Sequence, residues 1–193
     1  DYSLTDGWDG CPKGAFLSIY DDCEWEDYQV VEGNAYSDAM LVRAIMEKCP
    51  KRIAKRIAKK RGEAFAYFLL QVEREHGIPP EVRGILAAWA CMESAYNNFA
   101  KGDPRFSKSK KKPMAIGILQ QWKIYEKMYP GMDRTNPESA ATTWMKHIVK
   151  QLPKVEKQCK YKTEKKNWLA AWVTGIRYKK VGGRCKEMPK HYR

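Results

Sequence analysis

Hydrophobic residues recur at helical spacing along most of this chain, so the sequence predicts a mainly α-helical fold. The pattern is most regular from Pro79 to Phe99, where two prolines and Glu81 form a favourable helix start. The large apolar residues of this segment fall on one helical face: Val82, Ile85, Leu86, Trp89 and Tyr96. We expect a buried helix here, with the other elements packed around it.

Two further helices are expected between Ser37 and His76. Ser37 is a suitable N-cap for the first, which the pattern carries to Cys49-Pro50. The second starts with the basic segment KRIAKRIAKKR, which fits either a solvated outer face or a surface for anionic polymer or lipid. It continues into AFAYFLL, which we assign to the core, and Gly62 is expected to kink or interrupt it.

After Phe99 the helical pattern is interrupted. Lys101 to Pro113 is rich in lysine and turn residues and is expected to be a loop. Residues 115–120 hold a glycine between apolar residues, which indicates a short strand or a turn where something approaches the backbone closely.

Two helices are expected in the remaining chain. The first should be capped by Thr135 or Asn136, start near Pro137 and end near Pro153. The second is a short apolar helix over residues 167–172, ahead of a basic tail with little pattern.

Composition indicates one well-filled domain that meets an anionic partner. The chain has 193 residues, of which 44% are hydrophobic and 12% aromatic, and its net charge is +13. Such a charge suits nucleic acid, an acidic membrane surface or a bacterial wall, and charge alone does not choose among them. No apolar run approaches the roughly 20 residues of a membrane span.

The cysteines and histidines do not form a recognisable metal site. Six cysteines without a C-x-x-C pair favour up to three disulfides in an oxidising compartment. Cys91 is the exception we allow for, because a cysteine inside an apolar helix is often a small core filler. His76, His147 and His191 are widely spaced, and we interpret each as an ordinary surface or capping residue.

Glu93 is the residue with the clearest chemical interpretation. It falls on the apolar face of the central helix, between Trp89 and Tyr96. Burial disfavours the charged carboxylate, so its pKa should rise by about 1–3. A carboxylic acid of raised pKa beside aromatic walls suits the general acid of a glycosidase. The alternative is that Glu93 points to solvent at a frayed helix end.

Three segments resemble the motifs of the soluble lytic transglycosylase and goose-type lysozyme superfamily. Glu93-Ser94-Ala95-Tyr96-Asn97, the segment AIGILQ from Ala115 to Gln120, and LAAWVTG from Leu169 to Gly175 occur in that family's order and spacing. The motif-bearing part covers about 76–181. The resemblance implies a lysozyme-like, transglycosylase-type helical domain over residues 39–193. Residues 1–38, acidic and rich in aromatic residues, would then be an extension that shapes a cleft or wraps onto the basic surface.

The resemblance also implies an activity and a set of site residues. The activity is cleavage of the β-1,4 bond between N-acetylmuramic acid and N-acetylglucosamine in peptidoglycan, without metal or cofactor. Glu93 matches the family's catalytic acid. The residues expected to bind substrate or support the acid are Ser94, Tyr96, Gly117, Ile118, Gln120, Gln121 and Trp172.

The third motif and the second carboxylate depart from a simple match. Trp172 stands where the family often has a tyrosine, so the position can donate but not accept a hydrogen bond. Asp103 is the only acid between Glu93 and Gly117, and we interpret it as a turn residue. Without a clear second acid, a transglycosylase forming a 1,6-anhydro product is favoured, and hydrolysis as in lysozyme stays open.

The sequence therefore predicts a monomeric, periplasmic or secreted peptidoglycan glycosidase, in a mature form that lacks a signal peptide. A non-catalytic wall-binding protein or a basic nucleic-acid-binding protein is the alternative. No nucleic acid is expected as partner, because helix-turn-helix, zinc-finger and RNP patterns are absent from the sequence.

Overall fold

The structure is a computed structural model that describes residues 15–17, 23–25, 34–49, 59–103, 112–159, 167–168 and 170–171. Most of these residues are helical, which confirms the expected mainly α class. The helices are α1 (Asn34–Lys48), α3 (Lys59–Glu75), α4 (Ile85–Ser94), α5 (Ile124–Met128) and α6 (Pro137–Cys159). The strands are β1 (Ala15–Leu17), β2 (Cys23–Trp25), β3 (Lys101–Gly102), β4 (Ala115–Ile116) and β5 (Gln121–Trp122).

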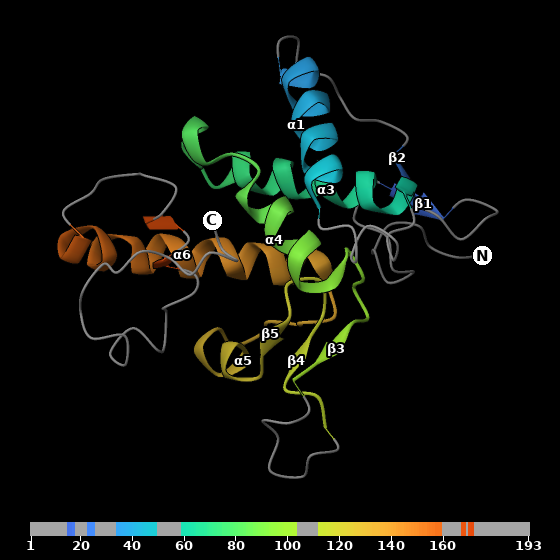
Figure 1. The fold of residues 1–193 in the computed structure, drawn as a ribbon. Coiled ribbons are helices and arrows are strands. Elements are labelled where there is room, and N and C mark those ends of the chain that lie inside the picture. The colour runs from blue at the N-terminus through green and yellow to red at the C-terminus, as the bar shows by residue number, and fades with distance from the viewer. Residues whose placement is uncertain are drawn as a thin grey trace.

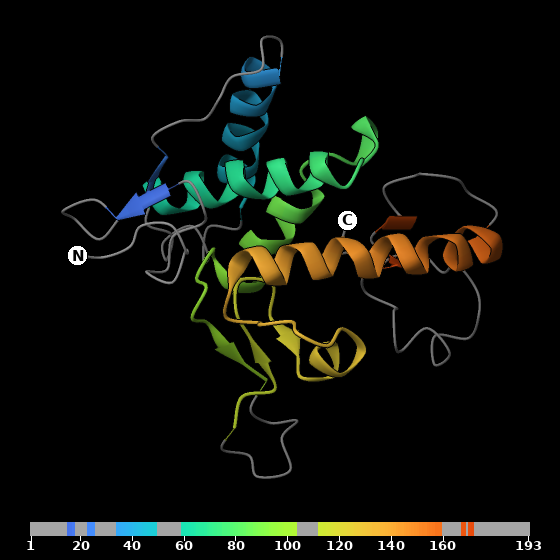
Figure 2. The same cartoon turned by 180° about the vertical axis from the view of Figure 1, so that it is seen from behind.

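Helix α4 occupies the middle of the fold. Figure 1 shows it between α3 on one side and α6 on the other, with α1 crossing α3, and the view from behind in Figure 2 agrees. Helix α3 contacts α1, α4 and α6, so these helices share one core. Its largest fully buried side chains are Trp144, Tyr96, Phe65, Leu69, Leu70, Ile85, Leu86, Ile118, Leu119, Met145, Ile148 and His147.

The central helix is shorter than the sequence pattern predicts. Residues Pro80–Val82 form a 3-10 turn, and α4 begins only after Gly84, whose φ is 85°. Buried Glu73 of α3 accepts hydrogen bonds from the backbone N–H groups of Gly84 and Leu86, each at 2.7 Å. A carboxylate from a neighbouring helix therefore caps α4, and a sequence pattern cannot show such a cap.

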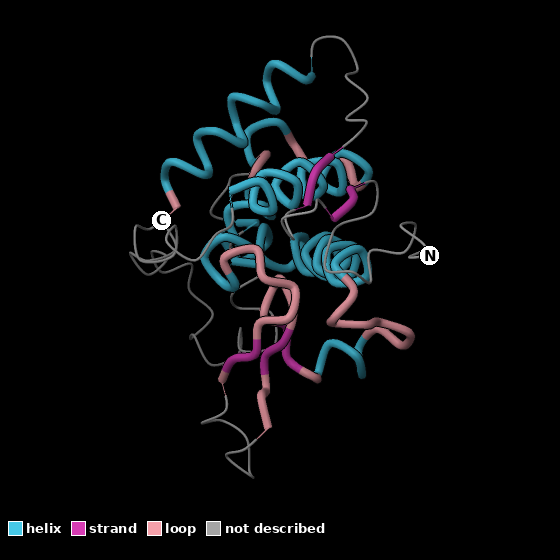
Figure 3. The backbone as a smooth tube through the Cα atoms, turned by 90° about the vertical axis from the view of Figure 1, so that its right-hand side faces the viewer, coloured by secondary structure: helices cyan, strands magenta, loops and turns pink. Residues whose placement is uncertain are grey.

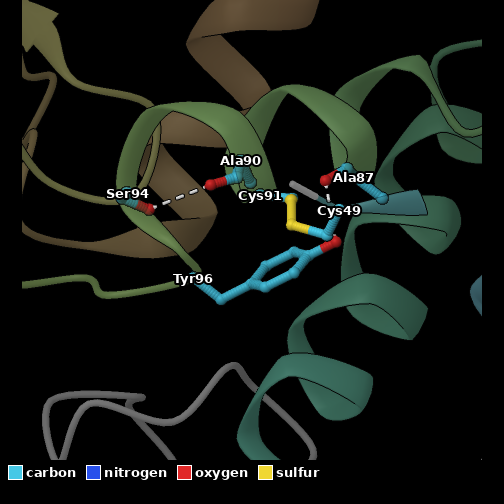
Figure 4. Close-up of a disulfide and its surroundings, with 6 residues drawn as sticks. All are labelled: Cys49, Ala87, Ala90, Cys91, Ser94 and Tyr96. Atoms are coloured by element: carbon cyan, nitrogen blue, oxygen red, sulfur yellow. Dashed lines mark hydrogen bonds between the residues drawn. A yellow bond between two sulfur atoms is a disulfide. The ribbon is translucent and has the colours of Figure 1, made fainter. Parts of the chain in front are cut away.

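Helix α4 also ends before Phe99. Ala95 and Tyr96 have φ values of 55° and 57°, so the backbone leaves the helix directly after Ser94. The side chain of Tyr96 turns back beneath α4 and donates a hydrogen bond to the carbonyl oxygen of Ala87 at 2.8 Å (Figure 4). The expected apolar face is nevertheless buried as predicted, at Val82, Ile85, Leu86, Trp89 and Tyr96.

Helix α1 starts at Asn34, so Ser37 lies inside the helix. The prediction of Ser37 as the N-cap is therefore wrong. The next residue, Asp38, is fully buried and forms ion pairs with Arg74 of α3 and Arg83 before α4. A buried carboxylate needs such partners. The expected boundary between the N-terminal extension and the helical domain, at residues 38 and 39, thus falls inside α1. The ion pairs of Asp38 connect this helix to α3 and to the segment before α4.

Helix α3 is continuous through Gly62, so the predicted interruption there is wrong. The AFAYFLL segment is buried except at Tyr67, which confirms its assignment to the core. Most of the basic segment ahead of it, residues 51–58, lies outside the described part of the chain.

Helix α6 continues to Cys159, past the predicted end at Pro153. Pro153 and Val149 both lie on the exposed side, so water can bond the carbonyl group of Val149 that proline leaves without its helical partner. The helix start is as predicted, because the side chain of Asn136 accepts a hydrogen bond from the backbone of Ser139 at 3.0 Å. Described residues between 167 and 171 are helical, and Trp168 and Ala171 are buried.

Strands β3, β4 and β5 form a small antiparallel sheet with β4 in the centre, next to the helices in Figure 3. Gly102 pairs with Ala115, and Ala115 pairs with Trp122. The segment 115–120 is therefore a short strand followed by a turn, as expected. Strands β1 and β2 form a separate hairpin, and β2 contacts α3.

A disulfide joins Cys49, at the end of α1, to Cys91 of α4, with the two Cα atoms 6.3 Å apart (Figure 4). The interpretation of Cys91 as an unpaired filler is therefore wrong. Its helix position is apolar and buried, but its neighbour across the helix–helix contact is another cysteine, 42 residues earlier in the sequence.

Among the helices that the structure describes, none combines the length and apolar character needed to cross a bilayer. Within the same residues, His, Cys, Asp and Glu side chains form no group of three or more that could hold a metal ion.

Candidate functional site

Glu93 lies in the last turn of α4 and is partly buried. Desolvation by the surrounding protein, together with the negative charge of Asp103, raises the pKa of its carboxyl group from 4.5 to about 7. The expected direction is confirmed, and the size falls within the expected range. A carboxyl group with this pKa is largely protonated in mildly acidic solution, so it can donate a proton there.

Asp103 is closer to Glu93 than the sequence suggests. It follows β3 directly, and its φ of 54° places it in the left-handed region that aspartate adopts more readily than most residues. Its carboxylate accepts a hydrogen bond from the indole N–H of Trp122 at 3.0 Å. The charge of Asp103 acts on Glu93, which makes Asp103 the candidate for the second carboxylate of the site.

Ser94 connects α4 to the turn after β4. Its hydroxyl group lies 2.7 Å from the carbonyl oxygen of Ile118 and 3.1 Å from that of Ala90, the helical carbonyl drawn in Figure 4. The shorter contact joins the residue after Glu93 to the Gly117-containing turn. Ser94 thus fixes the geometry between two of the three predicted motifs.

The backbone conformation at position 117 and a close backbone neighbour both require a glycine there. Its φ is 82°, and a Cβ atom at this position would collide with the carbonyl oxygen of Arg134. Its N–H group donates to the carbonyl oxygen of Ala100 at 3.0 Å. The close approach to the backbone predicted here is confirmed, and the approaching group is the carbonyl of Arg134.

The side chains of Tyr96 and Ile118 are both fully buried. Burial also raises the pKa of the Tyr96 hydroxyl, which is engaged with Ala87. Of the two predicted roles, binding substrate or supporting the acid, burial of the side chains favours support. Tyr96 supports α4 from below, and Ile118 contributes the carbonyl oxygen that Ser94 bonds.

The side chains of Gln120 and Gln121 both donate hydrogen bonds to backbone carbonyl groups. The side chain of Gln120 donates to the carbonyl oxygens of Ala100 at 3.0 Å and Gly117 at 2.9 Å, and its φ is 49°. Gln121 is buried and donates to the carbonyl oxygen of Ala140 in α6 at 3.2 Å. Gln120 is half-exposed at the turn, whereas Gln121 is not accessible to substrate, so its predicted contact is wrong.

Sequence reasoning missed Arg134, which bonds the backbone on both sides of the segment 115–120. Its buried guanidinium group donates to Glu126 at 2.6 Å and to the backbone carbonyl groups of Met114 at 3.1 Å and Gln121 at 3.0 Å. An arginine in the segment MDRTNP resembles any other loop cation of this basic chain, so no sequence signal separates it.

Trp122 was also missed, because it follows the AIGILQ motif and belongs to no motif itself. It is half-buried, and its indole group bonds Asp103. Trp172, the tryptophan that the sequence analysis selected, lies outside the described residues.

His147 is not a surface residue, which corrects its predicted role. It is 1% exposed, and its Nδ1 atom lies 3.1 Å from the hydroxyl oxygen of Tyr129. Desolvation, with a smaller effect from Lys150, lowers the pKa of His147 to about 4. The imidazole is therefore neutral at physiological pH and packs edge-on against Tyr125 and Tyr129.

A pocket of about 240 Å³ opens between α1 and α4 beside the disulfide. Its lining includes Leu41, Ile45, Arg83 and Met92, but neither Glu93 nor Asp103. The two candidate carboxylates therefore do not line this pocket.

One face of α6 concentrates positive charge. Four exposed lysines follow one another at helical spacing on this face: Lys146, Lys150, Lys154 and Lys157. We call them the α6 lysine row. A row of like charges on one helix face attracts a polyanion.

Comparison with protein-family models, with characterised proteins and with solved structures found no match for this chain. The resemblance to lytic transglycosylases therefore rests on the three motifs alone. The function has to be argued from Glu93, Asp103 and the groups that hold them.

Proposed function

We propose that this protein is a glycosidase that cleaves peptidoglycan, with Glu93 as the general acid. The observation that carries the proposal is the partial burial of Glu93, which, with the charge of Asp103, raises the pKa of its carboxyl group to about 7. Two carboxyl groups with different environments are what acid-catalysed glycoside cleavage requires.

Glu93 supplies the proton. In its protonated form it donates to the glycosidic oxygen of the leaving sugar, which lowers the barrier to breaking the bond at the anomeric carbon. Desolvation of the partly buried carboxyl group is the main reason that its pKa lies near neutral pH.

Asp103 supplies negative charge beside the reacting centre. An ionised carboxylate there stabilises the positive charge that develops on the sugar ring, or activates water against the anomeric carbon. Because Asp103 is a candidate second acid, hydrolysis is better supported here than it was from the sequence. The 1,6-anhydro route, in which the substrate's N-acetyl group assists, remains the other outcome of the same site.

The partner we propose is the anionic glycan of a bacterial wall. The α6 lysine row and the net charge of +13 support attraction to a polyanion. The Cys49–Cys91 disulfide supports an oxidising compartment, which agrees with a periplasmic or secreted location.

The test is digestion of purified peptidoglycan by the wild type and by Glu93→Gln, with soluble products read by mass spectrometry. Native and chemically deacetylated walls are both assayed, and Glu138→Gln, an exposed glutamate of α6, is the matched control. We expect muropeptides from the wild type and the control and a loss of at least roughly 100-fold in Glu93→Gln. Reducing product ends identify a lysozyme, and anhydro ends identify a transglycosylase.

A second candidate function is non-catalytic binding to a wall or to nucleic acid, which the α6 lysine row also supports. It becomes the better account if the wild type releases nothing from either wall and yet sediments with it.

A further inference from the structure

The sheet brings Trp122 to Asp103 from the far strand. In an antiparallel sheet, directly paired residues project to the same face. Trp122 pairs with Ala115, and Ala115 pairs with Gly102, so these three residues form one row across the sheet. The other two residues of the row are an alanine and a glycine, and the side-chain oxygen of Gln120 lies over Gly102.

The conformation of Asp103 completes the contact. In a regular strand, Asp103 would project to the face opposite that of Gly102 and hence opposite that of Trp122. Its φ of 54° breaks this alternation, and the carboxylate meets the indole N–H at 3.0 Å. The indole group of tryptophan has one donor and no acceptor, so its polar atom suits a carboxylate.

The geometry points to Trp122 as a positioning residue: its indole N–H orients the carboxylate of Asp103, whose charge acts on Glu93. This inference deepens the proposed function and rests on it for the chemistry, but the positioning itself is a property of the folded protein. Of the described residues, Asp103 is the charged group whose field acts on Glu93. A residue that holds Asp103 therefore controls the electrostatic environment of the acid.

The contact also constrains the direction of the Asp103 side chain. Asp103 follows the two-residue strand β3 and precedes residues 104–111, which lie outside the described chain. A hydrogen bond to a carboxylate is stronger than one between neutral groups, so the indole N–H selects one direction for the Asp103 side chain.

The experiment is a double-mutant cycle read by NMR titration of the Glu93 carboxyl carbon, in the full chain with its disulfide intact. The variants are Trp122→Phe, which keeps an aromatic ring and removes the N–H, Asp103→Asn, and the double variant. We expect each single variant to lower the pKa of Glu93 by about 0.5 to 1, because the negative charge of Asp103 is displaced or removed. The double variant should match Asp103→Asn, because Trp122 acts through Asp103.

Trp144→Phe, at a buried tryptophan of α6, is the matched control and should leave the titration of Glu93 unchanged. The inference is overturned if Trp122→Phe leaves the titration of Glu93 unchanged while Asp103→Asn shifts it. It is also overturned if the effect of Trp122→Phe persists in the Asp103→Asn background, or if Asp103→Asn has no effect.

Activity is measured on the same variants as a separate readout. If the pKa shifts occur but no variant, including the wild type, cleaves peptidoglycan, the proposed function fails and the positioning role of Trp122 stands. If the wild type cleaves the wall and the alkaline limb of kcat/KM moves down with the NMR pKa in Trp122→Phe, both stand.

Discussion

The hydroxyl group of Ser94 lies 2.7 Å from the carbonyl oxygen of Ile118, so a single hydrogen bond joins the residue after Glu93 to the turn that follows β4. The two segments are 24 residues apart in the sequence. Their relative position determines the distance between Glu93 and the sheet that carries Asp103 and Trp122.

The first prediction concerns that hydrogen bond. Ser94→Ala should lower the free energy of unfolding by about 1 kcal/mol, the usual loss for one partly buried hydrogen bond. Activity on peptidoglycan should fall by roughly tenfold or more, because a small displacement of a general acid is costly. Urea unfolding and a turnover assay measure the two effects.

Ser139→Ala is the control for this prediction. Ser139 also makes one hydrogen bond to backbone, accepting from the N–H of Asp133 at 2.9 Å, but it lies on α6. The two variants should lose similar stability, and only Ser94→Ala should lose activity. Equal losses of activity would show that Ser94 acts through stability alone.

The second prediction concerns the pH dependence of stability at Glu93. Its pKa is about 7 in the folded protein and near 4.5 when exposed, so the unfolded state releases this proton first as pH rises. Stability is therefore fully present below pH 4.5 and falls by about 3 kcal/mol between pH 4.5 and 7. Glu93→Gln should remove this loss and be more stable than the wild type above pH 7.

Thermal unfolding of both proteins from pH 4 to 9 checks this prediction, with Glu138→Gln as the exposed control. A wild type and Glu93→Gln whose stabilities remain parallel across the range would contradict the raised pKa. In the activity assay, the same pKa predicts that kcat/KM declines above about pH 7.

Some of this site follows from sequence, and some does not. The apolar stripe from Val82 to Trp89 predicts burial of the face that carries Glu93, and burial is the main cause of its raised pKa. This step needs only helical periodicity, which is local. The Asn136 cap is predictable for the same reason, since its partner lies three residues away.

The hydrogen bond from Trp122 to Asp103, whose charge acts on Glu93, is not predictable in this way. It depends on the register of three strands and on the left-handed conformation of Asp103, and neither leaves a periodic signal. The start of α4 was misjudged for a similar reason, because its cap comes from Glu73 on another helix.

The third prediction concerns acid sensitivity at His147. Its pKa is about 4 in the folded protein, against about 6.5 when exposed, so the unfolded state binds the proton first as pH falls. The stability contributed by the neutral imidazole is present above pH 6.5 and decreases by about 3 kcal/mol towards pH 4. His147→Gln, which can still bond Tyr129, should flatten this part of the stability profile.

His76→Gln is the comparison for His147. Desolvation also lowers the pKa of His76, but this residue is only half-buried, so its variant should change the profile less. A larger effect at His76 than at His147 would contradict the assigned burial.

The fourth prediction concerns the disulfide between α1 and α4. Cys49 and Cys91 close a loop of 42 residues, so replacing both by alanine should cost about 4 kcal/mol of stability on the chain-entropy estimate. The wild type treated with a reducing agent should lose at least as much stability as the double variant, because reduction also opens any other disulfide. Unchanged stability after complete reduction would show that the bond is not formed in solution.

The last prediction concerns the α6 lysine row and salt. Replacing Lys150 and Lys154 by glutamine removes half of the row, whereas replacing Lys123 and Lys127 removes the same charge from exposed positions at α5. If the row attracts the wall, the first pair should reduce the initial rate of wall digestion about threefold or more at 10 mM salt, and the second pair should have a smaller effect. At 0.15 M salt the Debye length shortens from about 30 to 8 Å, so the difference between the pairs should shrink. Equal effects of the two pairs would mean that net charge, and not the row, attracts the wall, and rates that do not respond to salt would exclude electrostatic capture altogether.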